Sequence, residues 1–181
     1  MAGTIAPTPT PVVLSATDRF TRWTLAGGRI AIGVLWLTNT RWKTPLDFGE
    51  DGGGGLYGFT KDAVDHPVLA PYSWLVDHVV LPQFRLFGWL VLLLEVFLGA
   101  FLLLGLATRF WGVVGALQAV VIGLSVARTP GEWPWSYILM VVANLTVAAT
   151  AAGRYAGLDG VLRPIWSDRP GRWSRLLSRV S

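Results

Sequence analysis

The sequence predicts an all-α membrane protein: a four-transmembrane-helix bundle with a short interfacial helix in the outer loop and an amphipathic cytoplasmic C-terminal helix. Composition is the first observation behind this prediction. Apolar residues make up 52% of the 181 residues and charged residues only 14%, and the mean hydropathy is +0.50, well outside the range of a soluble domain of this size. The second observation is the even spread of four apolar runs, because a helix needs about 20 such residues to cross a bilayer. We therefore expect one packed unit.

The first two predicted spans each contain one ionisable side chain. The stretch between Arg29 and Arg41 is too short to cross a bilayer, so the first span becomes long enough only as Trp23–Thr40, with Arg29 inside it. The second span, Leu86–Thr108, contains Glu95 near its middle and no other ionisable group. The bundle is thus expected to enclose an arginine and a carboxylate.

The remaining two spans are uncharged. The third is predicted at Phe110–Ala127, with Gln118 as its most polar member, and the fourth lies between Glu132 and Arg154 and carries Asn144. Together the spans divide the chain into a disordered N-terminal tail at 1–22, a transmembrane domain at 23–153 with its outer loop at 41–83, and a basic cytoplasmic tail at 154–181.

The charges that flank the spans predict the orientation. Segment 154–181 has six arginines against two aspartates, whereas the first loop carries six acidic residues against three basic ones. The positive-inside rule therefore places both termini in the cytoplasm and the chain in the cell (plasma or inner) membrane. We read the net charge of +4 as this orientation signal and not as nucleic-acid binding, because no groove-reading motif is present.

The outer loop has two unlike parts. Segment 47–62, DFGEDGGGGLYGFTKD, is glycine-rich and acidic, and we expect it to be flexible. Segment 66–82, HPVLAPYSWLVDHVVLP, has apolar residues at helical spacing, with Pro71 and Pro82 as a start and a stop, which predicts a short helix on the outer membrane surface. Segment 172–180 carries apolar residues and arginines on opposite faces of a helix, as an interfacial helix does, although an ordinary solvated basic tail fits it as well.

The residue inventory excludes most redox cofactors. The chain has no cysteine, which excludes disulfides, iron–sulfur clusters and cysteine-based zinc sites. Its two histidines, His66 and His78, both lie in the outer loop, so they cannot hold a haem between spans. We read them, with Asp77, as a solvated face and expect no metal site. Without a nucleotide-binding motif no flavin is expected either, so only a quinone remains.

Glu95 is expected to mark a site, because an ionisable group at mid-membrane costs about 3 kcal/mol and normally faces the bundle interior, paired or protonated. Arg29 is its expected partner, with Gln118 or Asn144 filling the gap between them. In the alternative interpretation, Arg29 extends to the cytoplasmic headgroups and Glu95 is a protonated donor that joins two helices.

Three sequence motifs carry a resemblance. Arg29-x-x-x-Gly33 with Lys43 just beyond it, Glu95-x-x-x-Gly99 followed by LLLGLATRF, and GRYAGLDGVLR after the fourth span together resemble the DoxX/DoxD family of four-helix membrane proteins. The chain is most similar to the DoxD type, the small subunit associated with thiosulfate:quinone oxidoreductase. The resemblance implies a membrane component of a quinone-linked redox system with other protein subunits. The glycine-rich insertion in the outer loop departs from the family pattern.

Three functions follow from these observations. The first is an oxidoreductase subunit that binds quinone between the first two spans, with Trp36 in the apolar slot for the ring, Arg29 as donor and Glu95 as the acid/base. The second is a structural or assembly subunit of a larger membrane complex, and the third is a pathway for protons or small solutes with Glu95 as relay. The other residues expected at the quinone are Gly33, Gly99 and Lys43.

Overall fold

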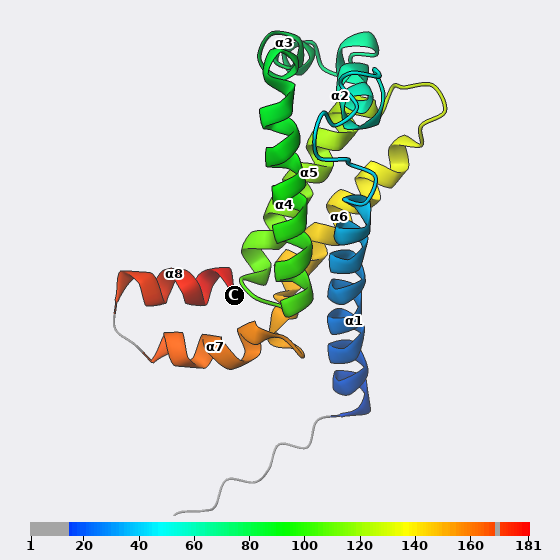
Figure 1. Cartoon of the computed structure of the whole chain (residues 1–181). Helices are drawn as coiled ribbons and strands as arrows, with labels where there is room; N and C mark the ends of the chain where they lie inside the picture. The colour runs from blue at the N-terminus through cyan, green and yellow to red at the C-terminus, as the bar shows by residue number, and fades with distance from the viewer. Residues whose placement is uncertain (1–14, 169–170) are drawn as a thin grey trace, which may run out of the picture.

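The computed structural model describes residues 15–168 and 171–181, and within this part of the chain every regular element is helical, which confirms the predicted all-α class. Long helices lie side by side in pairs, with short helices at both ends of the bundle (Figure 1). The elements are α1 (Ala16–Asn39), α2 (Gly55–Asp65), α3 (Ala70–Leu75), η1 (Val76–Val80), η2 (Leu81–Gln83), α4 (Phe84–Leu104), α5 (Thr108–Val126), α6 (Pro134–Thr150), η3 (Ala152–Arg154), α7 (Leu158–Ser167) and α8 (Arg172–Val180).

Two helical stretches among the described residues are long and apolar enough to cross a membrane. They are Ala70–Leu104, with 35 residues and a mean hydropathy of 2.4, and Thr108–Val126, with 19 residues and a mean hydropathy of 1.6. Helix α6 is also apolar but shorter, and α1 has the length, with 24 residues, without the same hydropathy. Large apolar side chains are exposed on these helices, among them Leu86, Leu90, Leu93, Phe97, Val113, Leu117, Val120, Ile138, Leu139, Val142 and Leu145.

Helix α1 begins earlier than predicted. A capping box starts it: the Asp18 backbone N–H donates to Ser15 Oγ (3.1 Å), and the Ser15 backbone N–H donates to Asp18 Oδ2 (3.2 Å). The helix therefore includes 16–22, which we had expected in a disordered tail, while 1–14 lie outside the described residues.

The long helices form two closely packed pairs. Helices α1 and α4 meet at two glycines, where a Cβ on Gly33 would lie 3.0 Å from the Gly99 carbonyl oxygen and a Cβ on Gly99 would lie 2.9 Å from the Gly33 carbonyl oxygen. Gly112 of α5 similarly lies against Ala148 of α6. Small residues let backbones approach this closely. The core that joins the two pairs consists of Trp36, Leu98, Leu102, Val147 and Ala152.

The glycine-rich part of the outer loop is folded, so the expected flexibility is wrong. Its second half forms α2, and its first half is fastened to α4 in two ways. Phe48 is fully buried over Gly88, where a Cβ would lie 2.5 Å from the phenyl ring. Arg85 Nε lies 3.1 Å from Glu50 Oε2, and its guanidinium also reaches Asp51. These contacts could not be predicted from the sequence, because glycine content alone predicts flexibility.

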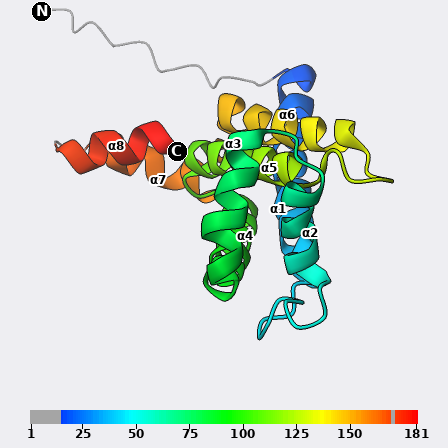
Figure 2. The same cartoon turned by 90° about the horizontal axis from the view of Figure 1, so that it is seen from above.

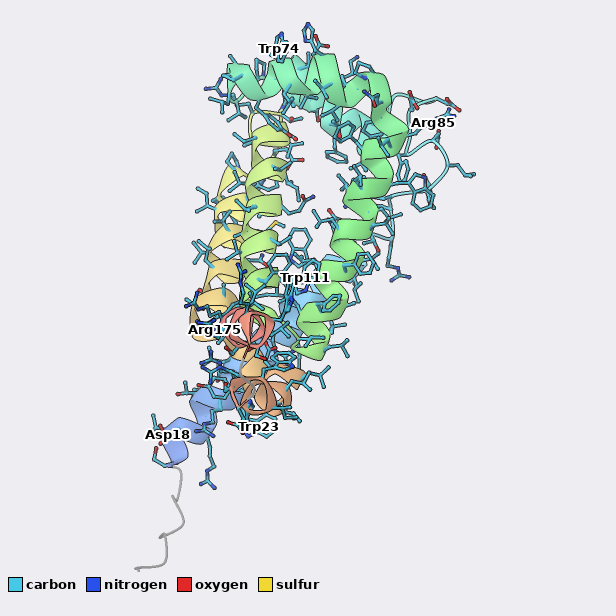
Figure 3. All side chains as sticks on the ribbon, turned by 90° about the vertical axis from the view of Figure 1, so that its left-hand side faces the viewer. Asp18, Trp23, Trp74, Arg85, Trp111 and Arg175 are labelled. Carbon is cyan, nitrogen blue, oxygen red and sulfur yellow. The ribbon has the colours of Figure 1, made fainter. Side chains whose placement is uncertain are left out.

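The second part of the outer loop is helical, as predicted for 66–82. Helix α3 begins at Ala70 with Pro71 in its first turn. Pro82 does not end the helix but lies in the 3-10 turn η2, where the chain changes direction and enters α4. Figure 3 shows the segment with Trp74 crossing the end of the bundle before α4 descends.

The predicted basic tail is also folded. Helices α7 and α8 lie at the end of the bundle opposite α2 and α3, and both project to one side of it (Figures 1 and 2). The amphipathic helix predicted at 172–180 coincides with α8.

Candidate functional site

Glu95 is buried inside the bundle, as expected, and its partner is Lys43. The exposed fractions are 1% for Glu95 and 3% for Lys43. The Lys43 Nζ donates to Glu95 Oε2 and also lies 3.4 Å from the carbonyl oxygen of Asn39. The Asn39 amide nitrogen lies 3.5 Å from each carboxylate oxygen. The two charged groups therefore form an enclosed ion pair, which we call the Lys43–Glu95 pair.

The turn after α1 brings Lys43 into this position. Thr40 Oγ1 donates to the Leu37 carbonyl (2.7 Å), and the Lys43 backbone N–H donates to the Thr40 carbonyl (3.1 Å), so the chain winds back over the end of α1. The Trp42 ring lies 4.8 Å from Lys43 Nζ and meets Phe59 of α2 edge-on, with ring centroids 5.2 Å apart. Helix α2 thus covers the pair from the outer loop.

Other polar side chains are buried in the bundle, one of them beside the Lys43–Glu95 pair. Gln118 of α5 is 7% exposed and lies beside the Glu95 carboxyl group. Asn144 of α6 accepts a hydrogen bond from the Trp36 indole N–H (3.2 Å) and donates to the Met140 carbonyl (2.8 Å). All four long helices therefore contribute polar groups to the interior.

The chemistry open to the Lys43–Glu95 pair is proton exchange. An ammonium and a carboxylate in contact can also exist as a neutral amine and a carboxylic acid, and a buried pair titrates as one unit. Lys43 Nζ carries three N–H groups, of which one is directed at Glu95 and one at Asn39, so a third remains for another acceptor.

Arg29 does not contact Glu95, so the expected pairing is wrong. It is fully buried, and its guanidinium donates to the carbonyl oxygens of Leu102, Leu103 (2.8 Å) and Ala156 (3.0 Å). The alternative, in which Arg29 extends to the headgroups, is wrong as well. Arg29 instead donates to carbonyls in the last turn of α4, where carbonyls lack the usual i+4 N–H partner; that of Leu102 also accepts from the Gly105 N–H.

The register of α1 against α4 explains this outcome. Because the two helices are antiparallel and cross where Gly33 meets Gly99, residues one turn before Gly33 face residues one turn after Gly99. Arg29 therefore lies at the end of α4, and Glu95 lies on the other side of the crossing, near Asn39. The two glycines predicted at the quinone are packed against each other at that crossing.

A second buried carboxylate lies at the end of the bundle that contains Arg29, away from Glu95. Asp159 is fully buried and accepts hydrogen bonds from the backbone N–H groups of Ala107 (2.8 Å) and Thr108 (2.9 Å) at the start of α5. Its own N–H donates to the carbonyl of Gly105 (2.8 Å), which adopts a left-handed conformation with φ of 65°. The GLATRF and GRYAGLDGVLR motifs thus fasten the turn between α4 and α5 to α7.

Of the six residues predicted at the site, the structure brings Glu95 and Lys43 into contact and keeps Arg29 apart. Trp36 is buried in the core, where it bonds to Asn144. The prediction from the sequence did not include Asn39. Its position was a usable signal, because Trp36, Asn39 and Lys43 have the spacing of one helical face that runs from α1 into the turn after it. Among the described residues no group of three or more metal-ligating side chains comes together.

Comparison with known proteins finds one family. The family described as "TQO small subunit DoxD" matches residues 65–178, more than half of the chain. The matched range includes Glu95, Asp159 and helices α3 to α7, and ends within α8, but it excludes α1 and therefore Arg29 and Lys43. No curated protein and no solved structure matches the chain.

Proposed function

The chain belongs to the DoxD family, and from this membership we propose that it is a membrane subunit of a quinone-linked oxidoreductase in which the Lys43–Glu95 pair exchanges protons with bound quinone. In this proposal α1, α4, α5 and α6 cross the cell membrane, and both termini lie in the cytoplasm. The arginine-rich end at α7 and α8 and the acidic outer loop support that orientation. Other subunits supply the electrons.

The burial of the Lys43–Glu95 pair is the observation that carries the proposal. Glu95 lies within a helical stretch whose mean hydropathy is 2.4, and Lys43 contacts it from the turn after α1. Two packed apolar residues would stabilise such a bundle at least as well, because taking two charges out of water costs several kcal/mol per ion. The enclosure of an ionisable pair in this apolar setting therefore supports proton chemistry.

The residues of the site fit the headgroup of a quinone. A quinone carbonyl requires a hydrogen-bond donor and a nearby group that supplies a proton, and Lys43 has one N–H that neither Glu95 nor Asn39 uses. When bound, the quinone would accept or return electrons and take up protons. The packed crossing of Gly33 and Gly99 leaves no room between those two residues, so we place the ring on the outer side of the crossing, against the pair.

Glu95 controls the charge of Lys43 in this arrangement. As a carboxylate it keeps the ammonium protonated and able to donate from Nζ. When the carboxyl group is protonated, the amine can be neutral and can accept a proton instead. Asn39 and Gln118 hold the carboxyl group in place by contacting it from α1 and α5.

An assembly subunit without its own chemistry is the second candidate. The Lys43–Glu95 pair also joins the end of α1 to the middle of α4, so it contributes to the fold whatever else it does. The exposed apolar side chains of α4, α5 and α6 would then contact partner subunits as well as lipid.

The variant Glu95→Gln distinguishes the two candidates. It keeps the shape and the hydrogen-bonding capacity of the side chain and removes the titratable proton. We expect the assembled complex to stay folded and to lose quinone retention, measured by lipid extraction, together with quinol-linked activity. Asp159→Asn is the matched control, because it makes the same chemical change at the other end of the bundle and should lower thermal stability without a selective loss of quinone. A Glu95→Gln protein that retains quinone and activity would favour the assembly subunit.

A further inference from the structure

A hollow of about 250 Å³ opens at the end of the bundle opposite the outer loop. It lies between the first turns of α1 and the connection from η3 to α7, segments far apart in the sequence. The residues that line it are Arg19, Arg22, Trp23, Arg154, Tyr155 and Ala156. Three arginines from two distant segments therefore line one hollow.

No acidic side chain lies in contact with these arginines. Within the described part of the chain, none of them forms an ion pair with an Asp or Glu side chain within 4.0 Å, although the buried Asp159 acts on Arg154 from further away. The nearest acid along α1, Asp18, is held by Ser15 in the capping box. The Arg22 guanidinium lies over the Tyr155 ring, 5.6 Å from its centroid, so an aromatic contact rather than a carboxylate places it at the hollow.

Arg154 is the least exposed arginine of the hollow. One of its terminal nitrogens donates to the Ser181 carbonyl (3.0 Å), but its Nε is buried without a partner. Burial lowers the pKa of Arg154 and the nearby guanidiniums of Arg163 and Arg109 lower it further, whereas Asp159 and Tyr155 raise it. An anion in the hollow would add negative charge beside this group of guanidiniums and reduce their repulsion.

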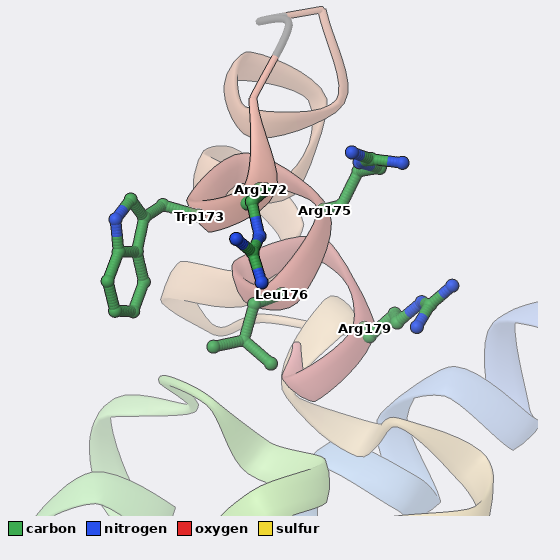
Figure 4. A pocket seen from close by; sticks show the side chains of 5 residues that line it. All are labelled: Arg172, Trp173, Arg175, Leu176 and Arg179. Carbon is green, nitrogen blue, oxygen red and sulfur yellow. The ribbon is translucent and has the colours of Figure 1, made fainter.

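The hollow lies where a membrane surface is expected. Phe20 and Trp23, on the same turns of α1, are 74% and 70% exposed, and large exposed aromatic residues at a helix end are typical of the headgroup region. Helices α7 and α8 lie across the same end of the bundle (Figure 1). Figure 4 shows Trp173 and Arg175 on opposite sides of α8, as an interfacial helix requires.

We propose that this hollow binds the headgroup of one anionic phospholipid. The phosphate lies among the guanidiniums of Arg19, Arg22 and Arg154, which match phosphate oxygens in geometry and charge. Inorganic phosphate shares that chemistry. The exposed ring of Trp23, which forms a wall of the hollow, favours a lipid because it offers the acyl chains an apolar surface.

A bound lipid would also stabilise the nearby helix junction. Ala156 lines the hollow, and its carbonyl accepts a hydrogen bond from the buried Arg29. The ligand would bridge α1 and η3 beside the contact that already joins them, so the thermal stability should rise with the logarithm of the lipid concentration once this exceeds the Kd.

The test uses the full chain in uncharged detergent micelles, titrated separately with short-chain phosphatidylglycerol, short-chain phosphatidylcholine and inorganic phosphate. We expect one saturable phosphatidylglycerol site per chain, with little binding of the other two. The double change Arg19→Gln/Arg22→Gln should weaken binding about 30-fold, because an arginine near an anionic surface contributes about 1 kcal/mol. Both residues are exposed, so the variant should melt at the wild-type temperature without lipid.

The matched control is Arg175→Gln/Arg179→Gln. It removes the same charge at the same end, beside a hollow of about 650 Å³ that is lined by α8 alone, and should leave phosphatidylglycerol binding within about two-fold of wild type. Equal weakening by both double variants would show a diffuse electrostatic effect and overturn the proposal. Competition by inorganic phosphate at the same concentration would identify a free-anion site, and the absence of saturable binding would show that no site exists; either result also overturns the proposal.

Discussion

Replacing Glu95 alone should destabilise the bundle more than replacing Glu95 and Lys43 together. In Glu95→Leu the ammonium of Lys43, only 3% exposed, loses the carboxylate that balances it. In the double variant Glu95→Leu/Lys43→Met, two apolar side chains of similar length fill the same space and leave no charge behind.

The magnitude follows from the burial of Lys43. Breaking a buried ion pair costs about 3–5 kcal/mol, whereas replacing both partners by apolar residues is often neutral or stabilising. In the single variant Lys43 can avoid being a buried unpaired charge by losing its proton. Neutralising an amine with a pKa of about 10.4 at pH 7 costs about 4.6 kcal/mol. We therefore expect a loss of about 3–5 kcal/mol for the single change and about 1 kcal/mol or less for the double change.

The same reasoning predicts a pH dependence for Glu95→Leu. Burial lowers the pKa of Lys43 while Glu95 raises it, so removal of Glu95 leaves only the lowering effect. The unfolded state then binds more protons than the folded state, and stability rises as the pH increases from 7 towards 10. Wild type, whose pair balances these effects, should change less over that range.

The assay is denaturant-induced unfolding in detergent micelles at pH 7 and pH 9.5, for the wild type, both single variants and the double variant. Arg29→Met serves as a further control: because Arg29 shares no partner with Glu95, its effect should add to that of Glu95→Leu within about 0.5 kcal/mol. Additive losses from Glu95→Leu and Lys43→Met would refute the pairing, as would coupling between Arg29 and Glu95.

Three further predictions concern the rest of the fold. Gly88→Ala should destabilise the protein by about 1–3 kcal/mol, because a Cβ there would overlap the buried ring of Phe48. Gly27→Ala, with open space around it, should stabilise the protein by about 0.5–1 kcal/mol. Thermal melts of the two variants compare these effects directly. Asp159→Ala should cost about 2–4 kcal/mol in the same measurement, through the loss of two charge-assisted hydrogen bonds to the start of α5. Single cysteines in place of Gly53 and Ser174 should label from outside the cell and only after permeabilisation, respectively, and labelling of both from one side would contradict the four-span topology.

Helical periodicity and hydropathy were enough to predict most of the fold. The long helices were each expected close to where they lie, as was α8. Helix α2 could not be predicted, because glycines weaken a helix in isolation and only the burial of Leu56 and Ala63 against the bundle compensates. The start of α1 had a local signal in Ser15 and Asp18, a pair typical of a helix start.

The candidate site was predicted in part. Glu95 was identified because a lone carboxylate in an apolar run is costly, and Lys43 was included only through the family resemblance. Its contact with Glu95 depends on a turn that reverses over the end of α1, and side-chain spacing does not encode such a turn. The misassignment of Arg29 was avoidable, because the register set by Gly33 and Gly99 already places it away from Glu95.

The bonds of Arg29 have a consequence for how the chain is made. Helix α1 is synthesised first, yet one of the carbonyls that accepts from its buried arginine, that of Ala156, comes 127 residues later. Until α4 is made, α1 carries an uncompensated guanidinium, which costs about 3 kcal/mol in a bilayer, and it lacks the hydropathy of α4 or α5. Its final place therefore depends on segments that leave the ribosome after it: first the end of α4, then the connection that contains Ala156. A nascent chain truncated before Ala156 would lack one of the three carbonyls that accept from Arg29.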